Sequence, residues 1–343
     1  MRFGLVAVVA VLCLVPTSPA RVRDDDPAAQ DKDKVKMDEE TRKAVDRALA
    51  WMKEQQQRDG SWGNTAITSF ALLAFMANGH VPNQGTYGDV VAKAVRYLLA
   101  CVRDRQGARD DGYLVGDRGG NMYCHGMATL ALTQVYGMTG DKEVRDVLKK
   151  AVDLIIRTQS REGGWRYDPN PDAGADISVT IMQVMALRGA KDSGLHVPDK
   201  TMDDALKYIR RCRDDRSGGY RYQPYSSGPG YARTAAGVCV LQLCGKYDAE
   251  EIKAAVEFMT RVGDDGQHYW YGHYYACHAL NQVGGKVWEE YYERMKGTLL
   301  PRQRPSGEWY DGRREAAYGP VYQTAIAVLI LSVPSHYLPI YQK

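Results

Sequence analysis

The sequence predicts an all-α protein in which six helical hairpins close into an (α/α)6 toroid. After residue 40, apolar residues recur at intervals of three and four positions, and no long alternating strand pattern appears. A short motif that contains glycine and tryptophan recurs along the chain, which indicates a repeat architecture. Segments with one charged face alternate with segments that are apolar on nearly all sides, as expected for an outer and an inner ring of helices.

The N-terminal part of the chain differs from the rest. Residues 1–20 combine the basic Arg2, an apolar run over residues 5–15 and small residues that end at Ala20, a pattern typical of a secretory signal peptide. The run is too short to anchor the chain stably in a membrane, although a retained lipid or helical anchor is the alternative. Residues 21–40 are nearly all charged or small, and we expect a flexible linker there. The mature protein is therefore expected to be exported, periplasmic or extracellular, without a transmembrane segment.

The recurring motif is Gln-x3-Gly-x-Trp, and it marks the loop inside each predicted hairpin. The first, third and sixth copies are complete, the fourth and fifth are weaker, and the second keeps only the glycine and an aromatic residue. The glycine is expected to end a helix in the left-handed conformation, and the aromatic residue can pack back across the hairpin. The six copies lie at residues 56–62, 112–113, 159–165, 214–220, 262–268 and 303–309.

The segments before each motif are amphipathic, and the segments after it are rich in alanine and apolar on nearly all sides. Because an all-apolar helix must be buried, six outer and six inner helices are expected to alternate in a closed double ring over residues 41–343. The predicted outer helices span residues 41–56, 90–103, 144–159, 202–213, 249–262 and 287–300. The predicted inner helices span residues 65–78, 123–136, 178–188, 231–243, 273–283 and 321–331.

One position is polar in every predicted inner helix, seven residues before a large apolar residue. A threonine hydroxyl bonds locally at the start of a helix, so the four threonines indicate a structural role. The two histidines fall in repeats two and five, which lie opposite each other in a ring of six. We therefore expect His125 and His273 to face one axial cavity, where they would serve as acid and base of an enzyme. The six residues are Thr68, His125, Thr180, Thr234, His273 and Thr324.

The motif copies and the alternating helices resemble the repeats of squalene and other triterpene cyclases and, more loosely, the β subunits of protein prenyltransferases. The resemblance covers residues 41–343 and implies the toroid, not an activity. Those cyclases use an Asp-x-Asp-Asp-Thr motif, whose counterpart here begins at Asp176 and has Ser178 in the place of the proton donor. The resemblance therefore implies no cyclisation of squalene. Asp176 is expected to cap a helix with a lowered pKa, or else to act as an orienting carboxylate.

We expect no metal and no cofactor. In the prenyltransferases an Asp-x-Cys element binds zinc, and the resemblance places Ser178 where the cysteine would stand. The pairs Cys124/His125 and His273/Cys277 carry groups that suit zinc, but they are expected on opposite walls of the ring. A nucleic-acid partner is excluded, because 45 lysines and arginines alternate with 42 acidic residues and form no basic run.

Aromatic residues crowd the loops and the starts of the predicted inner helices. The chain has 23 tyrosines and 4 phenylalanines, a bias that favours a cavity with hydrogen-bonding groups. We expect this cavity to hold an isoprenoid or other small apolar ligand. The expected ligand-binding residues are Tyr123, Tyr167, Tyr231, Trp270, Tyr271, Tyr275 and Tyr322.

Three other functions fit the sequence. One is an enzyme that uses His125, His273 and Asp176 in catalytic roles. Another is a scaffold whose outer helices bind a second exported protein. The last is a carbohydrate-active toroid with paired carboxylates drawn from Asp168, Asp172, Asp176 and Glu308.

Overall fold

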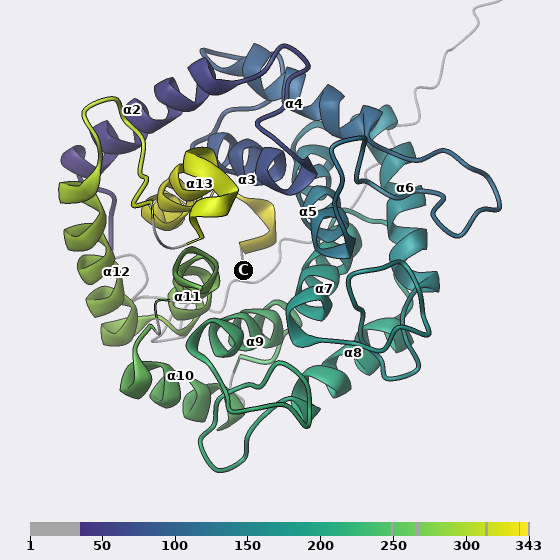
Figure 1. Cartoon of the computed structure of the whole chain (residues 1–343). Coiled ribbons are helices and arrows are strands. Elements are labelled where there is room, and N and C mark those ends of the chain that lie inside the picture. The colour runs from purple at the N-terminus through teal and green to yellow at the C-terminus, as the bar shows by residue number, and fades with distance from the viewer. Residues whose placement is uncertain are drawn as a thin grey trace, which may run out of the picture.

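The computed structural model confirms the all-α toroid. It describes residues 35–247, 250–264, 266, 268–312, 315–335 and 337–341. The expected signal peptide and most of the expected linker lie outside the described residues. Within the described part, twelve α-helices form two concentric rings, which Figure 1 shows along the axis of the toroid.

The outer ring contains the helices with a charged face, and the inner ring contains the apolar helices, as predicted. Each inner helix packs against the next one along the chain, and α13 packs against α3, so the inner ring is closed. The outer helices are α2 (Glu39–Gln55), α4 (Gly88–Ala100), α6 (Lys142–Arg157), α8 (Asp199–Arg211), α10 (Glu250–Val262) and α12 (Gly285–Leu299). The inner helices are α3 (Thr65–Met76), α5 (Met122–Thr139), α7 (Ile177–Asp192), α9 (Tyr231–Leu243), α11 (Tyr269–Val283) and α13 (Gly319–Ser332). Short 3-10 turns are η1 (Leu300–Arg302), η2 (Ala316–Tyr318), η3 (Val333–Ser335) and η4 (Pro339–Tyr341).

The toroid begins earlier in the chain than the sequence indicated. Helix α2 starts at Glu39, and the Asp38 side chain caps it by accepting a hydrogen bond of 2.8 Å from the Thr41 amide. Val35 packs against the core. The end of the expected linker therefore belongs to the folded domain.

The glutamine of each complete motif ties its loop to the next outer helix. Gln56 Nε2 donates to the carbonyl of Gly60 at 3.0 Å and to the carbonyl of Val90 in α4 at 2.9 Å. The third copy repeats this pair of bonds. In the sixth copy, Gln303 Nε2 donates to the carbonyl of Ala44 in α2 at 2.7 Å. This last bond joins the end of the ring to its beginning.

Close packing explains the glycine and the tryptophan of the motif. Gly307 has a φ of +110°, and a Cβ atom there would lie 2.6 Å from the carbonyl oxygen of Arg47. Trp165 is 1% exposed, and its indole N–H donates to the carbonyl of Ile155 at 2.7 Å. The other two motif tryptophans make the equivalent bond to their own preceding outer helices. Each complete motif thus fixes its loop against the outer helix of its own hairpin and against the outer helix of the next hairpin.

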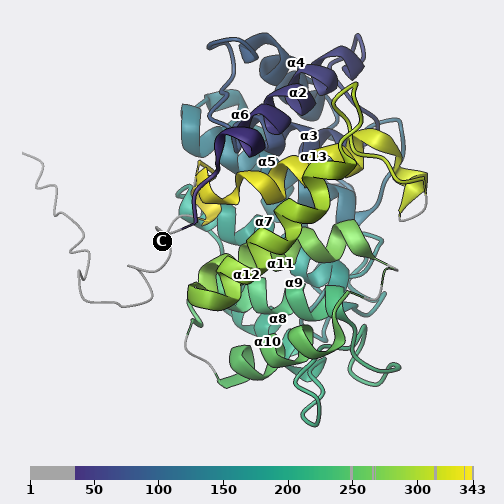
Figure 2. The ribbon, with the colours of Figure 1, turned by 90° about the vertical axis from the view of Figure 1, so that its left-hand side faces the viewer.

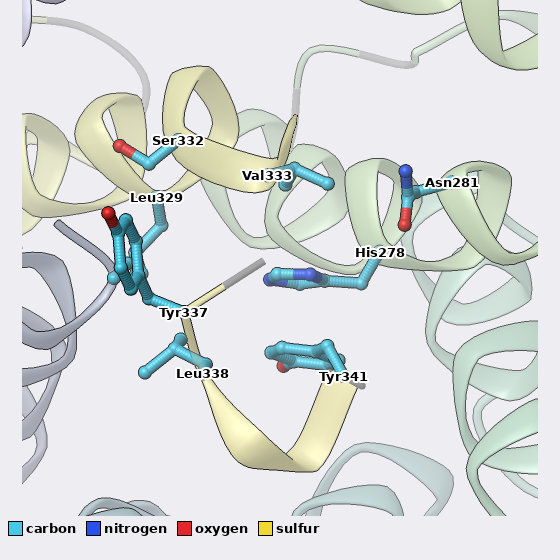
Figure 3. A pocket seen from close by; sticks show the side chains of 9 residues that line it. His278, Asn281, Leu329, Ser332, Val333, Tyr337, Leu338 and Tyr341 are labelled. Atoms are coloured by element: carbon cyan, nitrogen blue, oxygen red, sulfur yellow. The ribbon is translucent and has the colours of Figure 1, made fainter. Parts of the chain in front are cut away.

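The C-terminal turn η4 closes the end of the toroid at which the inner helices finish. Its yellow ribbon lies in the centre of the ring in Figure 1 and at one end of the barrel in Figure 2. The Ile340 amide donates to Gln134 Oε1 at 2.9 Å. The Tyr341 ring stacks on the His278 ring with 3.6 Å between the ring centroids (Figure 3). Burial lowers the pKa of His278 to about 3, so this ring stays neutral at physiological pH.

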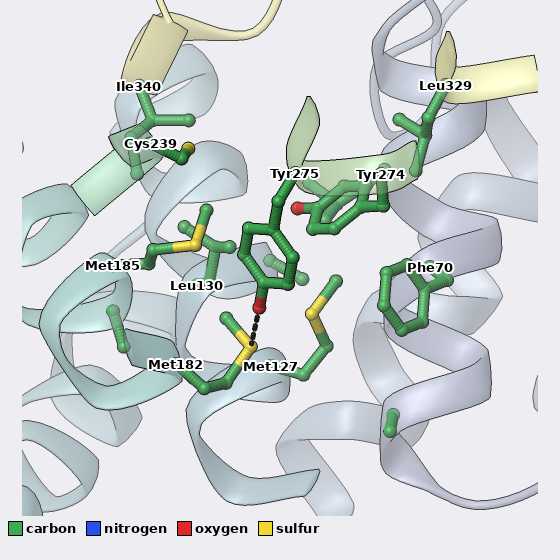
Figure 4. Close-up of a cluster of buried hydrophobic side chains, with 14 of the residues drawn as sticks. Phe70, Met127, Leu130, Met182, Met185, Cys239, Tyr274, Tyr275, Leu329 and Ile340 are labelled. Atoms are coloured by element: carbon green, nitrogen blue, oxygen red, sulfur yellow. Dashed lines mark hydrogen bonds between the residues drawn. The ribbon is translucent and has the colours of Figure 1, made fainter. Parts of the chain in front are cut away.

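Side chains fill the axis of the toroid next to this seal. Tyr275 reaches across from α11, and its hydroxyl donates to the sulfur of Met182 at 3.7 Å (Figure 4). Met127 and Phe70 lie in the same cluster. The region of α13, Ala316–Ser335, is long and apolar enough to cross a membrane, but 67% of its most apolar window is buried inside the protein. Such a composition is expected for an inner helix of this fold.

Candidate functional site

A cavity opens at the end of the toroid where the inner helices begin, opposite the C-terminal seal. Its volume is about 370 Å³, and residues at the start of all six inner helices contribute to its wall. The aromatic residues of the wall are Phe70, Tyr123, Tyr167, Tyr222, Tyr271, Tyr318 and Tyr322. The polar residues of the wall are Asn64, Asn121, Cys124, Ser178, Arg233, His268 and Glu315.

The structure brings part of the expected ligand-binding set into this cavity. Tyr231, Trp270 and Tyr275 do not line it, which corrects the prediction for these residues. Tyr231 packs on the ring of His273, Trp270 packs on Tyr269, and Tyr275 lies in the apolar core. Tyr231 and Trp270 lie on sides of their helices that do not face the cavity. Tyr275 does face the axis, but it lies one helical turn beyond Tyr271, among the side chains that fill the axis. The expected residues that do line it are Tyr123, Tyr167, Tyr271 and Tyr322.

His125 does not face the cavity, contrary to the prediction. Its imidazole is fully buried, where Nδ1 accepts a hydrogen bond from the Leu114 amide at 3.1 Å and Nε2 donates to the Ala151 carbonyl of α6 at 3.1 Å. Burial lowers the pKa of His125 to about 3. Both ring nitrogens of the neutral side chain are therefore occupied, and neither is available for acid–base catalysis.

The polar position that His125 occupies has a shared structural role. Thr180 Oγ1 accepts a hydrogen bond from the amide of the motif residue Trp165 at 3.0 Å. Thr234 accepts the same bond from the amide of Tyr220 at 2.9 Å. In repeat two, the imidazole replaces the threonine hydroxyl and holds the corresponding loop amide. The departure from threonine therefore preserves a loop contact, and it is not a sign of catalysis.

His273 also lies outside the cavity, between α11 and α12. It is 3% exposed, and its Nδ1 is 3.0 Å from the Tyr291 hydroxyl oxygen. Its Nε2 is 3.6 Å from Oδ2 of Asp264. The rings of Tyr231 and Tyr269 pack against the imidazole. The prediction that the two histidines face one axial cavity is thus wrong, because both imidazoles point toward outer helices.

Asp176 caps α7, as expected, but the expected direction of its pKa is wrong. Its Oδ1 accepts a hydrogen bond from the Val179 amide at 3.0 Å. Burial raises the pKa of Asp176 to about 6, because loss of hydration outweighs the hydrogen bonds from the helix. Among the described residues, none forms a hydrogen bond of normal geometry with Oδ2 of Asp176. The carboxyl group does not line the cavity.

Glu315 is the one carboxylate that lines the cavity among the described residues. Asp168 and Asp172 are exposed on the loop before α7. Glu308 is buried in its own loop, where Oε2 accepts a hydrogen bond of 2.5 Å from Ser306. Most glycoside hydrolases need two carboxyl groups that flank the scissile bond, and the described wall of this cavity offers one.

Glu315 connects two inner helices at the cavity wall. Its Oε2 accepts a hydrogen bond from the Trp270 amide at 2.7 Å and thereby caps α11. Its Oε1 accepts a hydrogen bond from the Tyr322 hydroxyl at 2.9 Å. Burial raises the pKa of the Glu315 carboxyl group. The residue has a φ of +54°, a left-handed conformation that costs a non-glycine residue about 1–2 kcal/mol and that is frequent at functional sites.

The expected set of ligand-binding residues did not include Glu315, Tyr222 or Tyr318, although all three line the cavity. Their segments follow a motif and precede an inner helix, but they carry no helical periodicity. Their position in the repeat was the signal that could have identified them. Glu315 lies between the sixth motif and α13, just as Asp176 lies between the third motif and α7. Connections of this kind recur at the same end of the ring in every repeat.

The described residues of the cavity wall form no metal centre. No group of three or more histidine, cysteine, aspartate or glutamate residues is close enough to hold a metal ion in the part of the chain that the structure describes. The six described cysteines are free, and Cys124 lines the cavity. Burial raises the pKa of the Cys124 thiol, so it stays protonated and weakly nucleophilic.

Comparison with known proteins identifies the fold. No protein-family model and no curated protein match the sequence. An inactive variant of α-1,6-mannanase from Salegentibacter sp. is 10% identical, with a TM-score of 0.65 over 87% of this chain and 99% of that one. A type II terpene cyclase from Scytonema, in complex with geranylgeranyl dihydroxybenzoate, is 13% identical, with a TM-score of 0.58 over 87% and 98%. Cellobiose 2-epimerase from Bacillus thermoamylovorans is 15% identical, with a TM-score of 0.65 over 85% and 98%. The chain shares the (α/α)6 toroid with proteins of different activities.

Proposed function

We propose that the protein binds an isoprenoid or other lipid-like ligand in the cavity where the inner helices begin, and that it does not cyclise squalene. The aromatic wall of the cavity is the observation that carries this proposal, because flat π faces pack well against unsaturated hydrocarbon. The cavity of about 370 Å³ lies near the lower end of the usual range for small-molecule sites, ~300–1,000 Å³, which favours a compact ligand. The terpene cyclase neighbour, which holds an isoprenoid substrate, supports the choice of ligand class. The proposal includes export of the mature chain, on the pattern of residues 1–20.

The placement of acidic groups supports the absence of cyclase activity. Ser178 lines the cavity where the family resemblance places the proton donor, and its hydroxyl is far too weak an acid. Asp176 has a raised pKa but does not reach the cavity. Glu315 does reach it, and burial raises its pKa, but the hydrogen bonds that it accepts from the Trp270 amide and the Tyr322 hydroxyl favour the ionised carboxylate and oppose that shift. None of the three groups is therefore suited to protonate an alkene.

Ligand titration with a blocked cavity tests this proposal. We expect farnesol to bind, detected by calorimetry and by quenching of the aromatic fluorescence. Ala66 lines the cavity, and Ala66→Trp should fill it and weaken binding by about tenfold or more, which corresponds to about 1.4 kcal/mol. Ala50 is exposed on α2, so Ala50→Trp is the matched control and should bind as the native protein does. Equal binding by both variants would place the ligand elsewhere, and no binding by the native protein would favour an interaction scaffold.

Sugar binding is the second candidate, and the hydrogen-bonding groups of the wall favour it. Asn64, Asn121 and Ser178 add donors and acceptors beside the tyrosine rings, which can also stack on sugars. Two of the structural neighbours are a mannanase and a cellobiose epimerase. Cellobiose and mannotriose should therefore be titrated beside farnesol. Tighter binding of either sugar would replace the lipid proposal.

A further inference from the structure

The charges in the cavity are unevenly distributed. Glu315 brings a carboxylate to the wall between α11 and α13. The cationic Arg233 comes from α9, and one of its nitrogens donates to the Gly228 carbonyl at 3.2 Å. His268 also lines the wall and lies near enough to lower the pKa of Glu315. The side of the cavity next to α13 is therefore the side with a negative charge.

The Glu315 carboxylate keeps hydrogen-bonding capacity for a ligand. A carboxylate offers about four acceptor positions. Strong hydrogen bonds from the Trp270 amide and the Tyr322 hydroxyl occupy two of them, and the Tyr271 amide approaches both oxygens at 3.4 Å. These contacts fix the carboxylate in place, because it is held from two different helices. The group is thus preorganised to accept a bond from a donor in the cavity.

Aromatic rings surround the same place. The Tyr322 ring lies 5.1 Å from the Tyr318 ring and 5.5 Å from the Phe70 ring, measured between centroids. Tyr271 lines the adjacent wall, and its hydroxyl oxygen is buried without a hydrogen-bond partner of normal geometry among the described residues. Ser178 and Tyr275 lie close enough to influence the pKa of that hydroxyl. The Tyr271 hydroxyl therefore lies beside Ser178 and Tyr275, and its ring adds to the aromatic wall of the cavity.

We propose that this corner of the cavity, formed by Glu315, Tyr271, Tyr318 and Tyr322, binds an organic ammonium group. A carboxylate attracts the positive charge, and the tyrosine faces add cation–π attraction. The N–H groups of a protonated amine can donate to the remaining acceptor positions of the Glu315 carboxylate. The inference rests on the proposed function for the apolar body of the ligand, and it adds the chemistry of the polar head.

Ligands that share one body and differ in their head test the inference. Farnesylamine, farnesol and farnesoic acid carry an ammonium, a hydroxyl and a carboxylate on the same hydrocarbon. We expect farnesylamine to bind about tenfold tighter than farnesol, with farnesoic acid weakest. In Glu315→Gln, which keeps an acceptor for the Trp270 amide, the preference for the amine over the alcohol should fall to about threefold or less. A native preference for the acid, or an unchanged preference in the variant, would overturn the inference.

Two controls separate the failure of this inference from the failure of the proposed function. Glu308 is a buried glutamate outside the cavity, and Glu308→Gln should keep the full preference for the amine. Benzylamine, benzyl alcohol and benzoate carry the same heads without an isoprenoid body. If no farnesyl compound binds but benzylamine binds in a Glu315-dependent way, the lipid body is wrong and the head-group inference holds. If neither amine binds, the head-group inference is overturned, and the proposed function is overturned with it only when farnesol also fails to bind. The melting temperatures of Glu315→Gln and Glu308→Gln are measured to check that each variant retains the fold.

Discussion

Truncation of Trp165 tests how the repeats hold the toroid together. Its side chain is 1% exposed between the hairpin helices, and a buried aromatic side chain removes about 150–250 Å² from water. At about 25 cal/mol per Å², burial of the native side chain contributes about 4–6 kcal/mol as an upper bound. Alanine retains part of this, and measured Trp→Ala changes in cores cost about 3–5 kcal/mol. We therefore expect Trp165→Ala to lower the free energy of unfolding by about 3–5 kcal/mol.

The hydrogen bond of the indole can be measured separately. Trp165→Phe keeps an aromatic ring but leaves the Ile155 carbonyl without its 2.7 Å partner, and it should cost about 1–3 kcal/mol. Tyr225 is 99% exposed, so Tyr225→Ala is the control and should change stability by less than about 0.5 kcal/mol. Urea unfolding followed by circular dichroism gives all three values. A loss below about 1 kcal/mol for Trp165→Ala would refute the role assigned to the motif tryptophan.

Three further outcomes follow from the buried acids and bases and from the cavity. His125 has a pKa of about 3 in the fold against an ordinary value of 6.5, so between these pH values its imidazole is protonated in the unfolded chain and neutral in the folded one. The free energy of unfolding should therefore fall as the pH drops from 6.5 toward 3. His125→Gln should flatten this dependence in denaturant melts at several pH values, and a native protein with constant stability over that range would contradict the buried neutral ring. Asp176 has a pKa of about 6 in the fold against an ordinary value of 3.8, so ionisation of its buried carboxyl group at neutral pH destabilises the folded state. Asp176→Asn keeps an oxygen that can cap α7, and it should raise the free energy of unfolding at pH 7 by on the order of 1–3 kcal/mol. This gain should vanish below about pH 4, where the carboxyl group is protonated in both states. A destabilised Asn variant at pH 7 would show that the charge itself supports the helix. Incubation with radiolabelled squalene and its epoxide at neutral and mildly acidic pH should give no polycyclic product on chromatography, and a product that disappears in Asp176→Asn would overturn the binding proposal.

The repeat motif determined the architecture from the sequence alone. Three copies of Gln-x3-Gly-x-Trp and the alternation of amphipathic and apolar segments were sufficient to predict the closed double ring. The reason is that the motif residues contact backbone groups of their own loop or of an adjacent helix, and every hairpin of such a ring supplies these groups. The helix starts were less well determined. Helix α11 begins at Tyr269, earlier than predicted, since its N-terminal capping partner Glu315 is far away in the sequence.

The site depended on the tertiary structure. The sequence singled out His125 and His273 as departures from threonine, but it could not tell which side of an apolar helix faces the axis, and both imidazoles proved to point outward. It also indicated a lowered pKa for Asp176 from the helix terminus, whereas burial by neighbouring repeats raises it. Tyrosines at inner-helix starts were recognisable because they sit in a repeated position. Glu315 was not, because only the closing of α13 against the rest of the ring brings it beside α11 and makes it part of a cavity wall.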